Sequence, residues 1–289
     1  MNPTQPATRT LAVPGATLTY DVREGTGSDV PLLLIGSPMG AGGFGTLASH
    51  FPERTVVTYD PRGVERSAKD DPTTESTPRQ HADDLHRIIG ALGDGPVDLF
   101  ASSGGAINAL ALVAAHPDDV RTLVAHEPPS ATVLPDSDAA LAACRAVRAT
   151  YERAGFGAGM AHFIAIVSHR GEFTDDVARQ PGPDPAMFGM PATDDGSRSD
   201  ALLAQNMITS TGYEHDFDAL RNASTRIVLA AGAESDGEMA NRAGKAVGER
   251  LGTPAVIFPG NHSGFLGGEY GQTGDPDGFA AALRKVLAG

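Results

Sequence analysis

The sequence is poor in cysteine and in basic residues, and each shortage excludes a class of protein. A single cysteine among 289 residues, Cys144, excludes an internal disulfide framework and any cysteine-based metal cluster. Its alanine-rich neighbourhood predicts a buried, unreactive thiol on a helix face. With 22 lysines and arginines against 36 acidic residues, the formal net charge is −14. This balance argues against nucleic acid and anionic membranes as partners, because both require a basic patch.

Long apolar runs are also missing. No run approaches the ~20 residues needed to span a bilayer, and the polar segment Met1 to Thr10 lacks the apolar core of a signal peptide. We therefore expect a cytoplasmic protein. The apolar content of 40% and the charged content of 20% are typical of a globular chain, and the length allows one large α/β domain with an insertion.

Short apolar runs alternate with stretches of helical periodicity along most of the chain. Residues 8–13 and 16–23 alternate apolar and polar side chains around a Pro-Gly pair, which predicts an antiparallel hairpin. Buried strands are then predicted at 31–35, 55–59, 97–101, 121–125, 226–231 and 255–258, and helices at 78–93, 104–116, 238–251 and 277–288. This alternation predicts an α/β fold with a mostly parallel central sheet and helices on both faces.

Residues 128–220 interrupt the alternation. They hold helix-like stretches at 139–154 and 158–168 and a segment rich in proline, glycine and aspartate at 180–200, but no strand run of comparable quality. We predict a helical cap inserted at 128–220 into a core domain formed by 1–127 and 221–289.

The predicted strand 97–101 continues into the next helix through a run of small residues. A sharp strand-to-helix turn can hold a serine with its hydroxyl exposed, and it requires small side chains two positions on either side of that serine. Ala101 and Gly105 meet this requirement for Ser103. Ser102 does not meet it, because the bulky Phe100 lies two positions before it. Ser103 is therefore the candidate nucleophile, and the alternative is a small-residue turn that lets the helix pack closely on the sheet.

Three further segments lie in the order known from one family. Residues 35–40 (IGSPMG) resemble the HG-x-P-G oxyanion loop of the α/β hydrolases, with Ile35 in place of the histidine. Residues 60–67 (DPRGVERS) are similar to the family's D-x-R-G-x-G-x-S segment, with Glu65 in place of a glycine. Residues 259–265 (PGNHSGF) resemble its late P-G-x-H loop. Over nearly its whole length, the chain resembles an α/β hydrolase with an inserted cap.

His262 is the candidate general base. It follows a predicted strand and lies in a loop bracketed by glycines, where an imidazole can reach a serine across the carboxyl edge of the sheet. The other histidines lack this context and are expected to pack or to lie at the surface, although His126 adjoins a candidate site residue and stays ambiguous.

The carboxylate that would orient this histidine is left open. Most of the family places it after the strand at 226–231, three residues past a glycine. Here that position is Ser235, flanked by Glu234 and Asp236. Some relatives, including certain haloalkane dehalogenases, place the acid after the strand equivalent to 121–125, where Glu127 precedes two prolines. We favour Glu127 and keep Asp236 as the alternative.

The resemblance also implies an oxyanion hole and a reaction. One backbone N–H would come from Gly104 and one from the 36–40 loop, where Pro38 has none, so that Ser37 or Met39 must supply it. We favour Ser37. The expected reaction is cleavage of an ester, lactone or related acyl bond of a small apolar molecule through an acyl-enzyme, with no metal or organic cofactor. A homodimer is left open.

Several alternatives remain. The same residues could serve C–C bond or amide hydrolysis or cofactor-free peroxidation, and a hydrolase fold could act as a non-catalytic receptor for a small ligand. Residues 40–45 (GAGGFG) also match the dinucleotide pattern G-x-G-x-x-G, with Asp60 at a suitable interval. We disfavour a nicotinamide enzyme because residues 36–39 separate the strand from this run and because Asp60 already belongs to the D-x-R-G segment.

Overall fold

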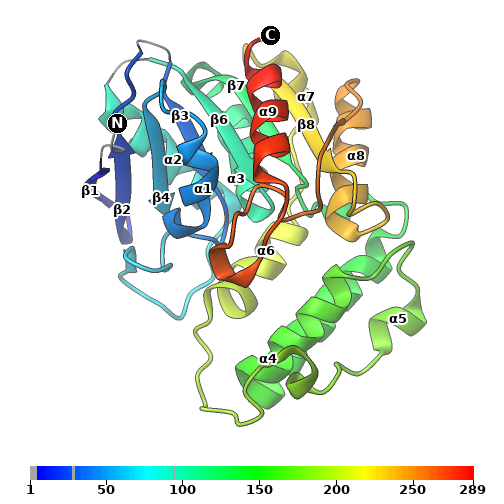
Figure 1. Cartoon of the computed structure of the whole chain (residues 1–289). Coiled ribbons are helices and arrows are strands. Elements are labelled where there is room, and N and C mark those ends of the chain that lie inside the picture. The colour runs from blue at the N-terminus through cyan, green and yellow to red at the C-terminus, as the bar shows by residue number, and fades with distance from the viewer. Residues whose placement is uncertain (1–4, 28–29, 94) are drawn as a thin grey trace.

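A nine-stranded sheet forms the centre of the computed structural model, which describes residues 5–27, 30–93 and 95–289 (Figure 1). The first four residues of the predicted core lie outside this description. The strands are β1 (Ala7–Val13), β2 (Ala16–Arg23), β3 (Leu32–Ile35), β4 (Val56–Asp60), β5 (Ala68–Lys69), β6 (Val97–Ser102), β7 (Val120–His126), β8 (Arg226–Gly232) and β9 (Val256–Phe258). Their order is β1-β2-β4-β3-β6-β7-β8-β9, with β5 paired to β2. The predicted hairpin is antiparallel, and every neighbouring pair from β4 to β9 is parallel, so the predicted fold class is confirmed.

The helices alternate with the strands as the periodicity predicts. They are α1 (Gly45–Ser49), α2 (Pro78–Leu92), α3 (Gly104–Ala115), α4 (Ser137–Val167), α5 (Asp175–Arg179), α6 (Met207–Thr211), α7 (Phe217–Asn222), α8 (Met239–Leu251) and α9 (Pro276–Leu287). Local sequence determines where they begin. At α2, the Thr77 hydroxyl accepts from the N–H of Gln80 and the Gln80 side chain accepts from the N–H of Thr77, which satisfies two N–H groups that would otherwise lack partners.

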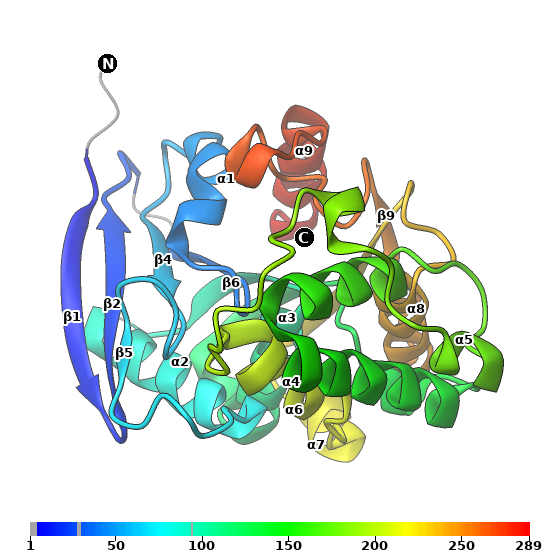
Figure 2. The same cartoon turned by 90° about the horizontal axis from the view of Figure 1, so that it is seen from below.

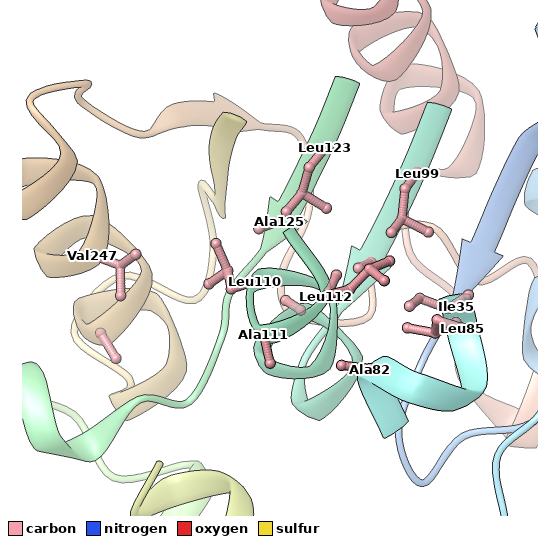
Figure 3. Close-up of a cluster of buried hydrophobic side chains, with 14 of the residues drawn as sticks. Ile35, Ala82, Leu85, Leu99, Leu110, Ala111, Leu112, Leu123, Ala125 and Val247 are labelled. Carbon is pink, nitrogen blue, oxygen red and sulfur yellow. The ribbon is translucent and has the colours of Figure 1, made fainter. Parts of the chain in front are cut away.

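Two apolar clusters cover the two faces of the sheet. Successive side chains of a strand point to opposite faces, and in β3 Leu33 and Ile35 enter one cluster while Leu32 and Leu34 enter the other. The first cluster packs the sheet against α2, α3 and α8, as Figure 3 shows in part. The second packs it against α1 and α9. Because all four β3 side chains are buried, the strand is a continuous apolar run, as a parallel strand covered on both faces should be.

The segment that contains α4, α5 and α6 lies beyond one end of the sheet (Figures 1 and 2). The two helical stretches predicted at 139–154 and 158–168 form one element, α4, broken at Gly155, whose φ of 81° is not helical. A π-helical turn, Ala201–Asn206, precedes α6. The boundaries of the proposed cap at 128 and 220 stay a prediction. Within the described ranges, no helix is both long enough and apolar enough to cross a membrane.

The two-residue strand β5 was not predicted. Ala68–Lys69 is too short to show an alternation of apolar and polar residues, and it pairs with only Ala16 and Thr17 of β2. It fixes the loop after β4 against the hairpin, close to the D-x-R-G segment that contributes to the candidate site.

Candidate active site

Ser103 lies at the turn between β6 and α3 in a strained backbone conformation, with φ 58° and ψ −131°. Its N–H donates to the carbonyl of His126 (2.9 Å), which ties the turn to the end of the neighbouring strand β7. A Cβ atom at Gly105 would lie 2.8 Å from Gly36 Cα, so only glycine lets α3 begin this close to the loop after β3. Non-glycine residues in such conformations cost about 1–3 kcal/mol and concentrate at functional sites.

Glu127 follows β7 and also has a positive φ, 47°. The side chain is fully buried and has four hydrogen-bond donors around it. Its Oε1 accepts from the N–H of Gly232 (2.8 Å), the hydroxyl of Ser235 (2.5 Å) and the amide of Asn241 (2.9 Å). Its Oε2 faces Nδ1 of His262 at 2.6 Å. Four donors on one carboxylate are the environment in which a buried charge is stable.

The electrostatics of Glu127 and His262 follow from this pairing. Burial alone raises the pKa of the Glu127 carboxyl, but the hydrogen bond and charge of His262 and the hydrogen bond from Ser235 outweigh burial, and the pKa lies well below its ordinary value. Burial alone lowers the pKa of His262, but the hydrogen bond and charge of Glu127 raise it above the usual 6.5, helped by Glu238. The carboxylate therefore stabilises an imidazolium, as the acid of a serine hydrolase must.

Ser103 and His262 line one cavity of about 920 Å³. No hydrogen bond joins the Ser103 hydroxyl to the His262 ring in the part of the chain that the structure describes. The His262 side chain is 35% exposed, and catalytic hydrogen bonds are often long until substrate binds. The cavity wall is mainly apolar. Helix α4, the turn before α6 and the start of α6 contribute apolar side chains to it: Val147, Phe156, Met160, Phe163, Ile164, Val167, Leu202 and Met207.

The predicted oxyanion loop lies beside the start of α3. The N–H groups of the first helical residues, Gly104 among them, have no partner within the helix. A Cβ atom on Gly104 would meet the carbonyl oxygen of Ser37 at 2.6 Å, so the two segments are in close contact. Ser37 and Met39 both line the cavity. Within the described ranges, no backbone acceptor bonds the N–H of either residue, so the geometry leaves both as candidate donors.

The alternative acids lie elsewhere. Asp236 is exposed and its Oδ1 pairs with Lys245 Nζ at 2.6 Å. Glu234 is exposed, and its carbonyl accepts from Arg170. Ser235 stands at the position where most of the family has its acid, and its hydroxyl donates to Glu127. Glu127 and the residue at the family's usual acid position are thus joined by a hydrogen bond.

His126, whose role the sequence does not determine, lies next to the candidate site. It is fully buried, its Nδ1 lies 3.1 Å from the Ser102 hydroxyl, and its ring stacks on that of His262 with the centroids 5.8 Å apart. Burial lowers its pKa to about 4, so the ring is neutral at pH 7. A neutral ring there packs beside His262 without repelling the imidazolium that the reaction would form.

The glycine-rich segment 40–45 forms a hydrogen bond with another part of the chain, Asp60. Asp60 Oδ1 accepts from the N–H of Ala41 at 2.8 Å, and Asp60 Oδ2 accepts from Arg66 Nε at 2.6 Å. A dinucleotide would need the N–H groups of such a loop and a free carboxylate for the ribose. The dinucleotide interpretation is therefore disfavoured by the structure as well as by the sequence.

Comparison with known proteins agrees with the fold. The family model described as "alpha/beta hydrolase fold" matches residues 32–151. An uncharacterized hydrolase of Bacillus subtilis, YraK, is 28% identical over 273 residues, which cover 89% of each chain. A zearalenone hydrolase of Bionectria ochroleuca is 32% identical over 128 residues, 42% of this chain and 47% of that protein. The solved structure of an esterase from Thermogutta terrifontis superposes with a TM-score of 0.67 over 99% of this chain and 98% of the other, at 21% identity.

These matches and the sheet order show that the chain has the α/β-hydrolase fold. A hydrolase of this fold is the class of protein that they support.

Proposed function

We propose that this protein is a serine hydrolase in which Ser103 is the nucleophile, His262 the general base and Glu127 the acid. The observation that carries the proposal is the buried Glu127 carboxylate, which holds His262 Nδ1 at 2.6 Å in the wall of the cavity that Ser103 also lines. A bond from Nδ1–H to a carboxylate leaves Nε2 free to accept a proton.

The reaction proceeds in two halves. The Ser103 oxygen attacks the acyl carbon while His262 Nε2 takes its proton, and the N–H groups of Gly104 and Ser37 hold the oxyanion. When the intermediate collapses, the imidazolium protonates the leaving group. Water then gives a proton to the same nitrogen and attacks the acyl carbon. As the bond between the acyl carbon and the Ser103 oxygen breaks, the imidazolium returns this proton to the serine oxygen, which restores the free hydroxyl and the neutral imidazole. Glu127 stays ionised throughout, as its lowered pKa allows.

The cavity indicates the kind of substrate. A volume of about 920 Å³ with a mainly apolar wall fits an ester, lactone or related acyl compound with a sizeable hydrocarbon part. The partial relative named as a zearalenone hydrolase supports including zearalenone among the substrates tested.

Labelling with a fluorophosphonate probe tests the nucleophile. We expect the wild-type protein to gain one phosphonyl group, located at Ser103 by peptide mass spectrometry, and the Ser103→Ala variant to gain none. Ser102→Ala is the matched control, because Ser102 is buried and hydrogen-bonded to His126. The Ser102→Ala variant should still be labelled at Ser103. A wild-type protein that is not labelled and cleaves no ester in a chromogenic panel would instead be a ligand receptor.

A further inference from the structure

Four non-glycine residues of the described chain have a φ in the left-handed region, and two of them, Ser103 and Glu127, belong to the site above. The other two are Glu65 (46°) and Tyr270 (54°). Although 205 residues apart in sequence, they are joined, because the Tyr270 hydroxyl donates to Glu65 Oε1 at 3.2 Å. Both side chains line the cavity that holds Ser103. The strained positions therefore gather at one place, as strain retained for function does.

The Glu65 carboxylate lies against the loop that is predicted to bind the oxyanion. A Cβ atom at Gly40 would come within 2.8 Å of Glu65 Cδ, so glycine at position 40 lets the carboxylate approach. The neighbouring cation does not neutralise it, since Arg66 bonds to Asp60 and to Asp21. Glu65 thus brings a negative charge to the wall of the cavity that Ser103 and His262 also line.

In the described ranges the Glu65 carboxylate has no cationic partner. Tyr270, which bonds it, is neutral, because burial and then the charge of Glu65 raise the pKa of the phenol to about 12. Among the residues described, no lysine or arginine pairs with Glu65, and none lines the cavity.

The other two acids of the wall are engaged. Glu238 pairs with Arg170 at 3.2 Å, and Asp200 Oδ1 accepts from the N–H groups of Leu202 and Leu203. Among the acids that line the cavity in the described ranges, Glu65 is therefore the one held by neither a cation nor backbone N–H groups.

We propose that Glu65, held by Tyr270, is a subsite for a positively charged group, an amine or quaternary ammonium, carried by a substrate whose apolar part fills the rest of the cavity. The proposal rests on the proposed function, since it names the substrate class of the same site. The same carboxylate should repel acyl compounds that carry a carboxylate or sulfonate. Glu65 is exposed to solvent, so we expect a discrimination of about 5- to 10-fold rather than the larger factors of a fully buried pair.

Three 4-nitrophenyl esters of matched shape test the subsite. They are the cationic 4-(trimethylammonio)butanoate, its uncharged isostere 5,5-dimethylhexanoate and the anionic 4-sulfobutanoate. For the wild-type enzyme we expect kcat/KM to fall in that order. In Glu65→Gln the ratio of cationic to uncharged ester should fall about 5- to 10-fold, and in Tyr270→Phe it should fall by less. Ratios equal to those of the wild type in Glu65→Gln would overturn the proposal.

Controls separate the subsite from general charge and from catalysis. Glu249→Gln removes an exposed carboxylate on α8, outside the cavity, and should leave the ratio unchanged. If it lowers the ratio as much as Glu65→Gln does, the net charge of the protein is the cause and the subsite is wrong. If Ser103 is not labelled and no ester is cleaved, the proposed function fails, and the dissociation constant of benzyltrimethylammonium then decides the subsite alone. Binding at least 5-fold weaker in Glu65→Gln supports the subsite, and equal binding refutes it.

Discussion

Replacing Glu127 by glutamine changes one atom of the side chain and should disable the proposed base. Oε1 of Glu127 accepts from three donors, those of Gly232, Ser235 and Asn241, so the amide oxygen of a glutamine must take that place. Its NH₂ group then faces His262 Nδ1, which has to accept instead of donate. The imidazole proton moves to Nε2, the nitrogen that must be free to take the serine proton.

The expected size of the effect follows from this tautomer. An acid-to-amide change that traps the wrong tautomer lowers kcat by about 10⁴-fold in a serine hydrolase, or about 5 kcal/mol of transition-state stabilisation. The assay is kcat on a neutral 4-nitrophenyl ester that the wild-type enzyme cleaves. Circular dichroism and the thermal midpoint show that the variant is folded.

Asp236→Asn is the matched control, because Asp236 is exposed and pairs with Lys245. We expect its kcat within twofold of the wild type. The reasoning is refuted if folded Glu127→Gln keeps kcat within tenfold of the wild-type value, and the acid is misassigned if the large loss occurs in Asp236→Asn instead.

Three further predictions concern the site and the core. The proposed base must be neutral to act, and Glu127 raises the pKa of His262 above 6.5. The acid limb of the kcat/KM profile should therefore have its midpoint above pH 6.5, and in Glu127→Gln this midpoint should move to lower pH. A midpoint that does not move would contradict the pairing of the two residues. Gly104→Ala would place a Cβ 2.6 Å from the carbonyl oxygen of Ser37, so we expect kcat to fall about 10²- to 10³-fold, and a loss below threefold would refute this contact as part of the oxyanion hole. Leu110→Ala removes a fully buried side chain of the core cluster (Figure 3) and should lower the free energy of unfolding by about 2–5 kcal/mol in urea titrations, whereas a loss below 1 kcal/mol would show that the cluster repacks.

The fold could be predicted from the sequence because its signals are local. Each buried parallel strand is a short apolar run, and the helices between them show helical spacing and capping residues, as at Thr77. The break in α4 was visible as the gap between two periodic stretches, and Gly155 explains it. The strand β5 escaped detection because a two-residue pairing leaves no pattern.

The candidate site was harder to predict from the sequence than the fold, because it depends on contacts between segments that are distant in the sequence. Small residues around the turn pointed to Ser103, and the family order pointed to His262. The choice of acid could not be settled from spacing, since two strands end at the same edge of the sheet. A signal was present at Ser235, because a hydroxyl at the usual acid position leaves room for a carboxylate from the neighbouring strand. The hydrogen bond from Asn241 to Glu127 was not predicted. Asn241 lies on α8, and the sequence around it contains no pattern that indicates this contact.

Cys144 offers a way to follow the cavity wall in solution. Its thiol is 2% exposed, lines the cavity and has a pKa raised by burial to about 11, so little thiolate is present at pH 8. As the chain contains no other cysteine, every alkylation event reports this one position. The rate at which iodoacetamide modifies the native protein therefore reports how accessible the cavity wall is at this position, and a ligand that fills the cavity should slow the reaction.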